Sequence, residues 1–189
     1  MSRTCCIFAG AGGSPVFMAD AAQITTLLLG DGWKLMYGGS SKGVMGVVGS
    51  VAVELGGNIT GVLPTRIARL KHYDPRINIV EADTMAERKA HFWACDSFVC
   101  LPGGVGTMDE IFEIWTLTKL GYIKPVKPIV VLNTAGFYDP LIAMINEMIR
   151  CGTMTRDRSG MVTFVNSPRE VISHINTQPS DNGVLNVPL

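Results

Sequence analysis

The chain has 189 residues, with 16 Lys or Arg, 16 Asp or Glu and a formal net charge of zero. This length predicts a single domain with a full core, and the balanced charge without any basic run argues against a nucleic-acid or membrane-binding surface. No apolar run is long enough to span a membrane, and the first residues lack the apolar core of a signal peptide. We therefore expect a cytoplasmic protein.

Apolar runs alternate with helix-like patterns along the whole chain. Strands are expected at residues 4–9, 33–37, 58–62, 77–81, 97–101, 128–132 and 161–165. Helices are expected at residues 16–29, 44–55, 85–94, 108–120, 140–150 and 168–175. This order predicts an α/β, single-domain, Rossmann-like fold over residues 1–177. Its sheet is doubly wound and mostly parallel, with helices on both faces.

The composition of the C-terminal residues and the cysteines add two expectations. The tail, residues 178–189, carries Pro, Ser, Asp, Asn and Gly and is predicted to be flexible. The five cysteines are an odd number, and Cys5 and Cys6 point to opposite faces of one predicted strand. This favours reduced cysteines in the core of an intracellular protein.

Ligands of doubly wound folds bind at the carboxyl ends of the strands. Three segments that follow predicted strands are rich in glycine, at residues 10–15, 38–43 and 102–107, and a fourth at residues 85–89 reads MAERK. None of them matches a dinucleotide fingerprint or a Walker A loop, and the serines lack a nucleophile elbow. The three histidines are scattered without metal-ligand spacing, so we expect no metal site.

Residues 101–110 (LPGGVGTMDE) predict a strand end, a glycine turn and a helix start. Such a helix N-terminus attracts an anion such as phosphate. Capping alone is an alternative, with Thr107 as N-cap and Glu110 three residues later. A plain cap does not need Gly103, Gly104 and Gly106 together, which favours the ligand site.

Residues 84–87 (TMAE) form a second capping-box pattern, followed by Arg88 and Lys89. Two interpretations of this basic pair stay open. One is a solvated basic face. The other is an Arg88 that faces the ligand, where its planar fork of donors suits a phosphate or a base. Asp109 is interpreted as an acid that complements the dipole of its helix.

Three motifs in this order resemble the LOG (LONELY GUY) family, long mislabelled as lysine decarboxylases. They are P-G-G-x-G-T-x-x-E at residues 102–110, M-x-x-R-K at residues 85–89, and a near match to Y-G-G-G-x-x-G-L-M-G at residues 37–46. The resemblance extends from Cys5 to Ile175. It implies hydrolysis of the N-glycosidic bond of nucleoside 5′-monophosphates, either cytokinin ribotides or AMP-like nucleotides, to free base and ribose 5-phosphate.

The resemblance also implies a homodimer that needs no cofactor. It assigns the catalytic roles to Arg88 and Glu110. The substrate-binding residues that it implies are Gly38, Gly39, Met85, Lys89, Gly103, Gly104, Val105, Gly106 and Thr107.

The first glycine loop departs from the family pattern. It reads AGAG at residues 9–12, where C-G-S-S is usual, and so lacks hydroxyls that could meet a nucleotide. A second hypothesis is therefore a non-catalytic nucleotide or cofactor carrier on the same scaffold, similar to molybdenum-cofactor carriers. Arg88 and Glu110 distinguish the two, because a carrier has no need of this pair.

Overall fold

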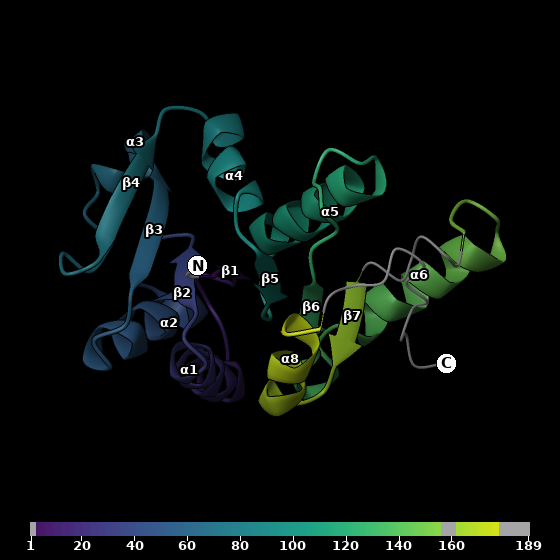
Figure 1. The fold of residues 1–189 in the computed structure, drawn as a ribbon, viewed down its shortest axis with the longest axis horizontal. Helices are drawn as coiled ribbons and strands as arrows, with labels where there is room; N and C mark the ends of the chain where they lie inside the picture. Colours follow the sequence, from purple (N-terminus) through teal and green to yellow (C-terminus); the bar gives the residue numbers. More distant parts are fainter. Residues whose placement is uncertain (1–2, 156–161, 178–189) are drawn as a thin grey trace.

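The computed structural model describes residues 3–155 and 162–177 (Figure 1). The tail predicted to be flexible, residues 178–189, lies outside the described residues. The division between a domain and a tail therefore stays a prediction.

Seven parallel strands form one sheet within the described residues. The strands are β1 (Thr4–Phe8), β2 (Lys34–Tyr37), β3 (Ile59–Pro64), β4 (Asn78–Ala82), β5 (Ser97–Cys100), β6 (Ile129–Leu132) and β7 (Val162–Val165). Their order is β4-β3-β2-β1-β5-β6-β7, and every neighbouring pair is parallel. The predicted doubly wound fold is confirmed, and the described sheet is parallel throughout.

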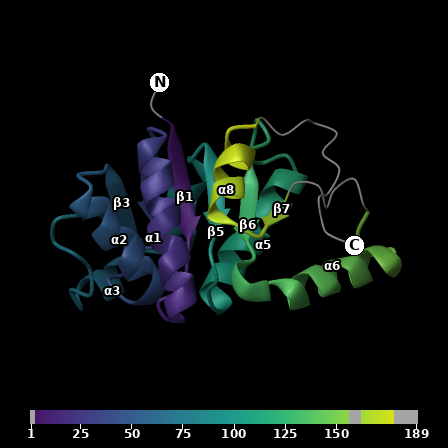
Figure 2. The ribbon, with the colours of Figure 1, turned by 90° about the horizontal axis from the view of Figure 1, so that it is seen from below.

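Helices cover both faces of this sheet (Figures 1 and 2). They are α1 (Pro15–Gly30), α2 (Gly43–Glu54), α3 (Thr65–Ala68), α4 (Met85–Trp93), α5 (Val105–Lys119), α6 (Asp139–Arg150) and α8 (Pro168–Ile175), with a short 3-10 turn η1 (Thr134–Gly136). Helices α1, α2 and α8 pack on one face, and α4, α5 and α6 on the other. None of the described helices is long and apolar enough to cross a membrane.

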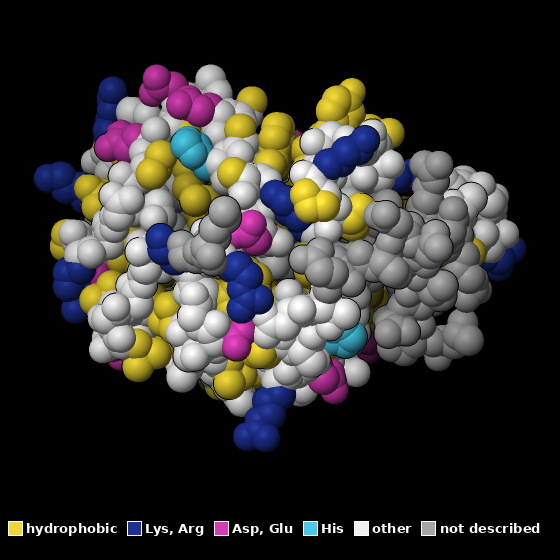
Figure 3. All heavy atoms as spheres, viewed as in Figure 1, with side chains coloured by type: hydrophobic (Ala, Val, Ile, Leu, Met, Phe, Trp, Pro, Cys, Tyr) yellow, Lys and Arg dark blue, Asp and Glu magenta, His cyan; other side chains and the backbone are white. Residues whose placement is uncertain are grey.

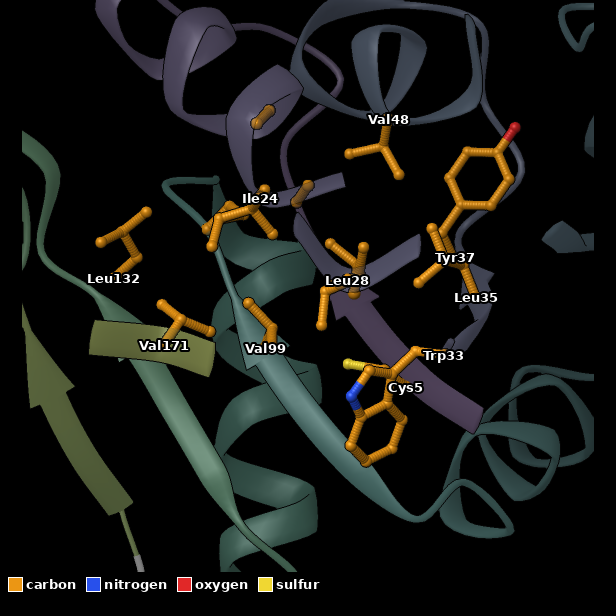
Figure 4. Packing of buried hydrophobic residues seen from close by; sticks show 14 of the residues in the cluster. Cys5, Ile24, Leu28, Trp33, Leu35, Tyr37, Val48, Val99, Leu132 and Val171 are labelled. Atoms are coloured by element: carbon orange, nitrogen blue, oxygen red, sulfur yellow. The ribbon is translucent and has the colours of Figure 1, made fainter. Parts of the chain in front are cut away.

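Two hydrophobic clusters, one on each face, hold the layers together. The first joins α1, α2 and α8 to the sheet through residues such as Ile24, Val48 and Val171 (Figure 4). The second packs Phe92, Trp115 and other residues of α4, α5 and α6 against the opposite face. The strands are therefore apolar on both sides, as expected for a parallel sheet between two helical layers.

Most of the cysteines lie in this core. Cys5, Cys6, Cys95 and Cys100 are buried and Cys151 is exposed, and all five are free. The predicted strand and helix boundaries hold within two residues, with one exception at α5 and with Met161 outside the described residues. The sequence did not predict the short helix α3 or the turn η1.

The start of α5 shows that the prediction of Thr107 as its N-cap is wrong. The helix begins at Val105 with Gly104 as N-cap, three residues earlier than expected, and has no side-chain cap. Thr107 is buried inside the first turn and is not the N-cap. The physical reason is local packing: a Cβ on Gly103 would clash with Thr107 Oγ1, so the absent side chain lets Thr107 fold over Gly103. Asp109 consequently lies beyond the first turn, and its predicted dipole role is wrong.

The other predicted capping box, at residues 84–87, is confirmed in part. Thr84 is the N-cap of α4, and its Oγ1 accepts a hydrogen bond from the Glu87 N–H at 3.0 Å. Glu87 Oε2 accepts from the N–H of Asp83 at 2.9 Å, one residue before the cap. Helix α4 thus starts where the sequence predicts, which fixes the direction in which Arg88 leaves it.

Candidate active site

The loops that follow β1 and β5 meet at the centre of the carboxyl edge of the sheet. Strands β1 and β5 are neighbours, and the strand order reverses between them, which is where ligands of such folds bind. The Gly10 N–H donates to the Pro102 carbonyl at 3.3 Å, and the Met45 N–H donates to the Gly10 carbonyl at 3.1 Å. Three separate segments are thereby tied together around one position.

A cavity of about 250 Å³ opens at this position. Its lining includes six residues that the sequence analysis singled out, namely Gly38, Arg88, Gly104, Gly106, Thr107 and Glu110. Ala9, Gly10, Ala11 and Met45 complete it. Arg88 faces the cavity and not bulk solvent, so it does not belong to a solvated basic face, and its contact with a ligand stays a prediction.

Arg88 and Glu110 form a buried ion pair in this cavity. Arg88 Nη1 donates to Glu110 Oε1 at 2.9 Å, and the two side chains are only 11% and 10% exposed. Arg88 Nε donates to the carbonyl of Val62 in β3 at 3.0 Å, and the guanidinium lies 4.9 Å from the ring centre of Phe92. Three contacts from different elements thus fix the direction of this guanidinium.

The Glu110 carboxyl sits in an environment that disfavours its charge. Burial raises its pKa above the ordinary glutamate value, and the charge and hydrogen bond of Arg88 offset only part of that rise. A partly desolvated carboxylate in a cavity interacts strongly with any positive charge that develops nearby. A carboxyl group with a perturbed pKa and a specific charged partner in a cavity is a candidate for a functional residue.

The N-terminus of α5 points into the same cavity. Gly104 caps the helix through its backbone alone, so the first N–H groups of α5 have no side-chain partner from the cap. A Cβ on Gly104 or on Gly106 would meet nothing within 4 Å, and neither φ is in the left-handed region. The fold does not require glycine at these two positions. Close approach of a ligand to the backbone would require it.

Gly38 and Gly39 differ in what they do. A Cβ on Gly38 would lie 2.9 Å from Arg88 Nη2 and 2.7 Å from Met45 Sδ, so this glycine makes room for the arginine. Gly39 has φ +81, and a Cβ there would lie 2.6 Å from Leu63 Cγ. Gly39 therefore shapes the turn after β2 and does not line the cavity.

The side chains of Met85, Lys89 and Val105 do not line the cavity. Met85 and Val105 are the first residues of α4 and α5 and are 50% and 88% exposed. Lys89 Nζ instead pairs with Glu113 Oε1 at 2.8 Å and with Asp109 Oδ2 at 3.3 Å. Adjacent residues of a helix point in different directions, and Lys89 points toward Asp109 and Glu113 of α5, whereas Arg88 points into the cavity.

A second cavity of about 340 Å³ adjoins the first and shares Gly10, Ala11 and Gly104 with it. Phe17 of α1 and Phe137, which follows η1, form an aromatic wall there, with ring centres 5.4 Å apart. Neither residue was predicted from the sequence to belong to the site. Their position just after β1 and β6, at the carboxyl edge, is the signal that could have found them.

Comparisons with known proteins identify the family of this chain. The family model described as possible lysine decarboxylase matches residues 45–175. A rice protein (Oryza sativa subsp. japonica) named probable cytokinin riboside 5′-monophosphate phosphoribohydrolase LOGL1 is 33% identical over 171 residues. The match covers 88% of this chain and 76% of that protein. The chain belongs to the LOG family. The cytokinin riboside 5′-monophosphate phosphoribohydrolase of Mycobacterium tuberculosis is 34% identical over 154 residues, covering 80% of this chain and 81% of that one.

Solved structures support the fold of this LOG-family chain. The molybdenum cofactor binding protein of Rippkaea orientalis superposes with a TM-score of 0.70 at 20% identity, covering 94% of this chain and 99% of that one. The molybdenum cofactor carrier protein of Chlamydomonas reinhardtii gives 0.70 at 19% identity, covering 92% and 95%. At these identities the likeness establishes the architecture and not the activity.

Proposed function

We propose that this LOG-family chain hydrolyses the N-glycosidic bond of nucleoside 5′-monophosphates, of the AMP or cytokinin-ribotide type, to free base and ribose 5-phosphate. The proposal rests on one observation: the buried Arg88–Glu110 pair and the open N-terminus of α5 line the same cavity. The names of the relatives at 33–34% identity support it.

The helix N-terminus is the proposed phosphate site. The N–H groups of Val105, Gly106 and Thr107 start α5, and the helix dipole adds partial positive charge there. Gly104 and Gly106 leave the backbone open to close approach. Glu110 follows on the second turn of the same helix, so a ribose attached to a phosphate at the helix start is placed beside its carboxylate.

The proposed reaction uses that carboxylate. Cleavage of the bond between C1′ and the base nitrogen builds positive charge on the ribose ring, because the bonding electron pair leaves with the base. The Glu110 carboxylate stabilises this charge and accepts a proton from the water whose oxygen bonds to C1′. That proton then passes from Glu110 to the base nitrogen that was bonded to C1′, which returns Glu110 to its carboxylate form. Arg88 holds the Glu110 carboxylate in place and presents its remaining N–H groups to the substrate.

A homodimer in the cytoplasm is the proposed form of the protein. Hydrophobic side chains are exposed on α5 and just after it, with Phe112, Leu120 and Tyr122 at 39%, 61% and 78%. Figure 3 shows hydrophobic atoms at the surface over this region. These exposed apolar side chains support α5 as the contact between the two subunits.

The direct test compares the wild type with Glu110→Gln, using release of adenine from AMP as the readout. We expect the variant to bind AMP and to lose turnover by several orders of magnitude. Equal turnover would refute the catalytic role. A wild-type protein that binds AMP and releases no base would instead support the carrier hypothesis, to which the loss of hydroxyls at residues 9–12 points.

A further inference from the structure

Two neighbouring cations on α4, Arg88 and Lys89, pair with different carboxylates on α5. Arg88 reaches Glu110 in the cavity, whereas Lys89 Nζ lies between Glu113 Oε1 at 2.8 Å and Asp109 Oδ2 at 3.3 Å. The side chains of Lys89 and Glu113 are only 17% and 24% exposed, so solvent screens this contact less than a surface pair, whereas Asp109 is 51% exposed. Lys89 therefore contacts the carboxylates of α5 that lie outside the cavity, and it does not line the cavity itself.

The need for Lys89 follows from the sequence of α5. Asp109, Glu110 and Glu113 put three carboxylates within five residues, on neighbouring positions of one helix. Like charges at this spacing repel one another. Lys89 pairs with Asp109 and Glu113, so these two carboxylates are neutralised without drawing on Arg88, whose own hydrogen bonds are to Glu110 and to the Val62 carbonyl.

We propose that Lys89 is a positioning residue for the reaction, which occupies Asp109 and Glu113 so that Arg88 pairs with Glu110 alone, and which adds positive charge beside the Glu110 carboxylate. This inference rests on the proposed function for the role of Glu110. It replaces the direct contact with substrate that the family motif implies for Lys89. Trp93 helps, because its Nε1 donates to Glu113 Oε2 at 3.4 Å and ties α4 to α5 a turn further on.

The charges around Glu110 give the sign of the effect. Arg88 and Lys89 of α4 lower the pKa of Glu110, and Asp109 of α5 raises it. The thiols of Cys6 on β1 and Cys100 on β5 also face Glu110, and burial raises their pKa so far that they stay neutral. Removing Lys89 takes away one lowering charge and leaves Asp109 unopposed. Both changes raise the pKa of Glu110.

The test is the pH profile of kcat/KM for release of adenine from AMP. In Lys89→Met we expect the acid limb to move to higher pH, with a several-fold loss of kcat/KM at a pH on that limb. In Asp109→Asn we expect the limb to move to lower pH. Lys89→Arg, which keeps the charge, stays closer to the wild type than Lys89→Met does. The matched control is Lys34→Met, an exposed lysine at the start of β2, on the opposite edge of the sheet. This control is expected to leave the profile unchanged.

Two results would overturn the inference. A higher KM in Lys89→Met with an unmoved acid limb would show that Lys89 contacts the substrate. A lower kcat with an unmoved limb would show that it only holds the two helices together.

A titration followed by nuclear magnetic resonance separates this inference from the proposed function. The carboxyl carbon of Glu110 is observed in protein labelled with ¹³C-glutamate and is assigned by its loss in Glu110→Gln. If the wild type releases no base, the proposed function fails, and the titration of Glu110 in Lys89→Met still decides the inference. If Lys89→Met does not fold, an unmoved Glu110 titration in Asp109→Asn overturns it.

Discussion

Replacing Gly106 by alanine is expected to make the protein more stable and less active. Gly106 is the second residue of α5, is exposed, and has an ordinary φ, and a Cβ there would meet nothing within 4 Å. A Gly→Ala change at a compatible position stabilises by about 0.4–1 kcal/mol, because the unfolded chain loses freedom. For a chain of this length that corresponds to a rise in Tm of about 1–4 °C.

The expected loss of activity has a different cause. The added methyl group stands where the phosphate is proposed to approach the first N–H groups of α5. Losing one charge-assisted hydrogen bond costs about 1.5–3 kcal/mol, which lowers kcat/KM by roughly tenfold to a hundredfold. Thermal unfolding measures the first effect, and release of adenine from AMP measures the second.

Gly30→Ala is the matched control. Gly30 is the last residue of α1, at the edge of the sheet opposite the cavity, and a Cβ there also meets nothing within 4 Å. We expect this control to gain similar stability and to keep full activity. A Gly106→Ala protein as active as Gly30→Ala would refute the reasoning, because no ligand would then approach the start of α5.

Three further outcomes are expected. Because burial raises the pKa of Glu110 and its ionised form is the active one, kcat/KM falls as the pH drops through a value above the ordinary glutamate pKa; a limb at the ordinary value would contradict this. Gly38→Ala lowers kcat/KM without unfolding the protein, because its Cβ would lie 2.9 Å from Arg88 Nη2; unchanged turnover would show that the arginine shifts at no cost. Tyr138→Phe removes the hydroxyl that donates to the buried Leu101 carbonyl at 2.7 Å, and urea unfolding is expected to show a loss of about 1–3 kcal/mol; an unmoved midpoint would argue against this role.

The strands and the layers could be predicted because their signal is local and periodic. Apolar runs such as IVVL in β6 leave no polar face, and this alone implies burial between two helical layers. The start of α5 could not be predicted in this way. Gly104 and Gly106 are poor helix formers, so the local signal pointed to Thr107, whereas packing of Thr107 over Gly103 starts the helix earlier.

The site was predictable in its motifs and less so in its geometry. The motif around Arg88 identified one side chain that faces the cavity and a neighbour, Lys89, that does not. The spacing of Asp109 and Glu113, four residues apart on α5, was the available sign that a cation from another helix would bridge them. Phe137 gave only the sign of its place after β6 at the carboxyl edge, because its packing against Phe17 of α1 depends on the tertiary fold.

Chromatography of the purified protein incubated with AMP and with an N6-prenylated AMP tests the central claim most directly. The account predicts that free base and ribose 5-phosphate appear in equal amounts, and that both disappear in Glu110→Gln. Bound nucleotide recovered intact from the wild type, with no base released from either substrate, would contradict it.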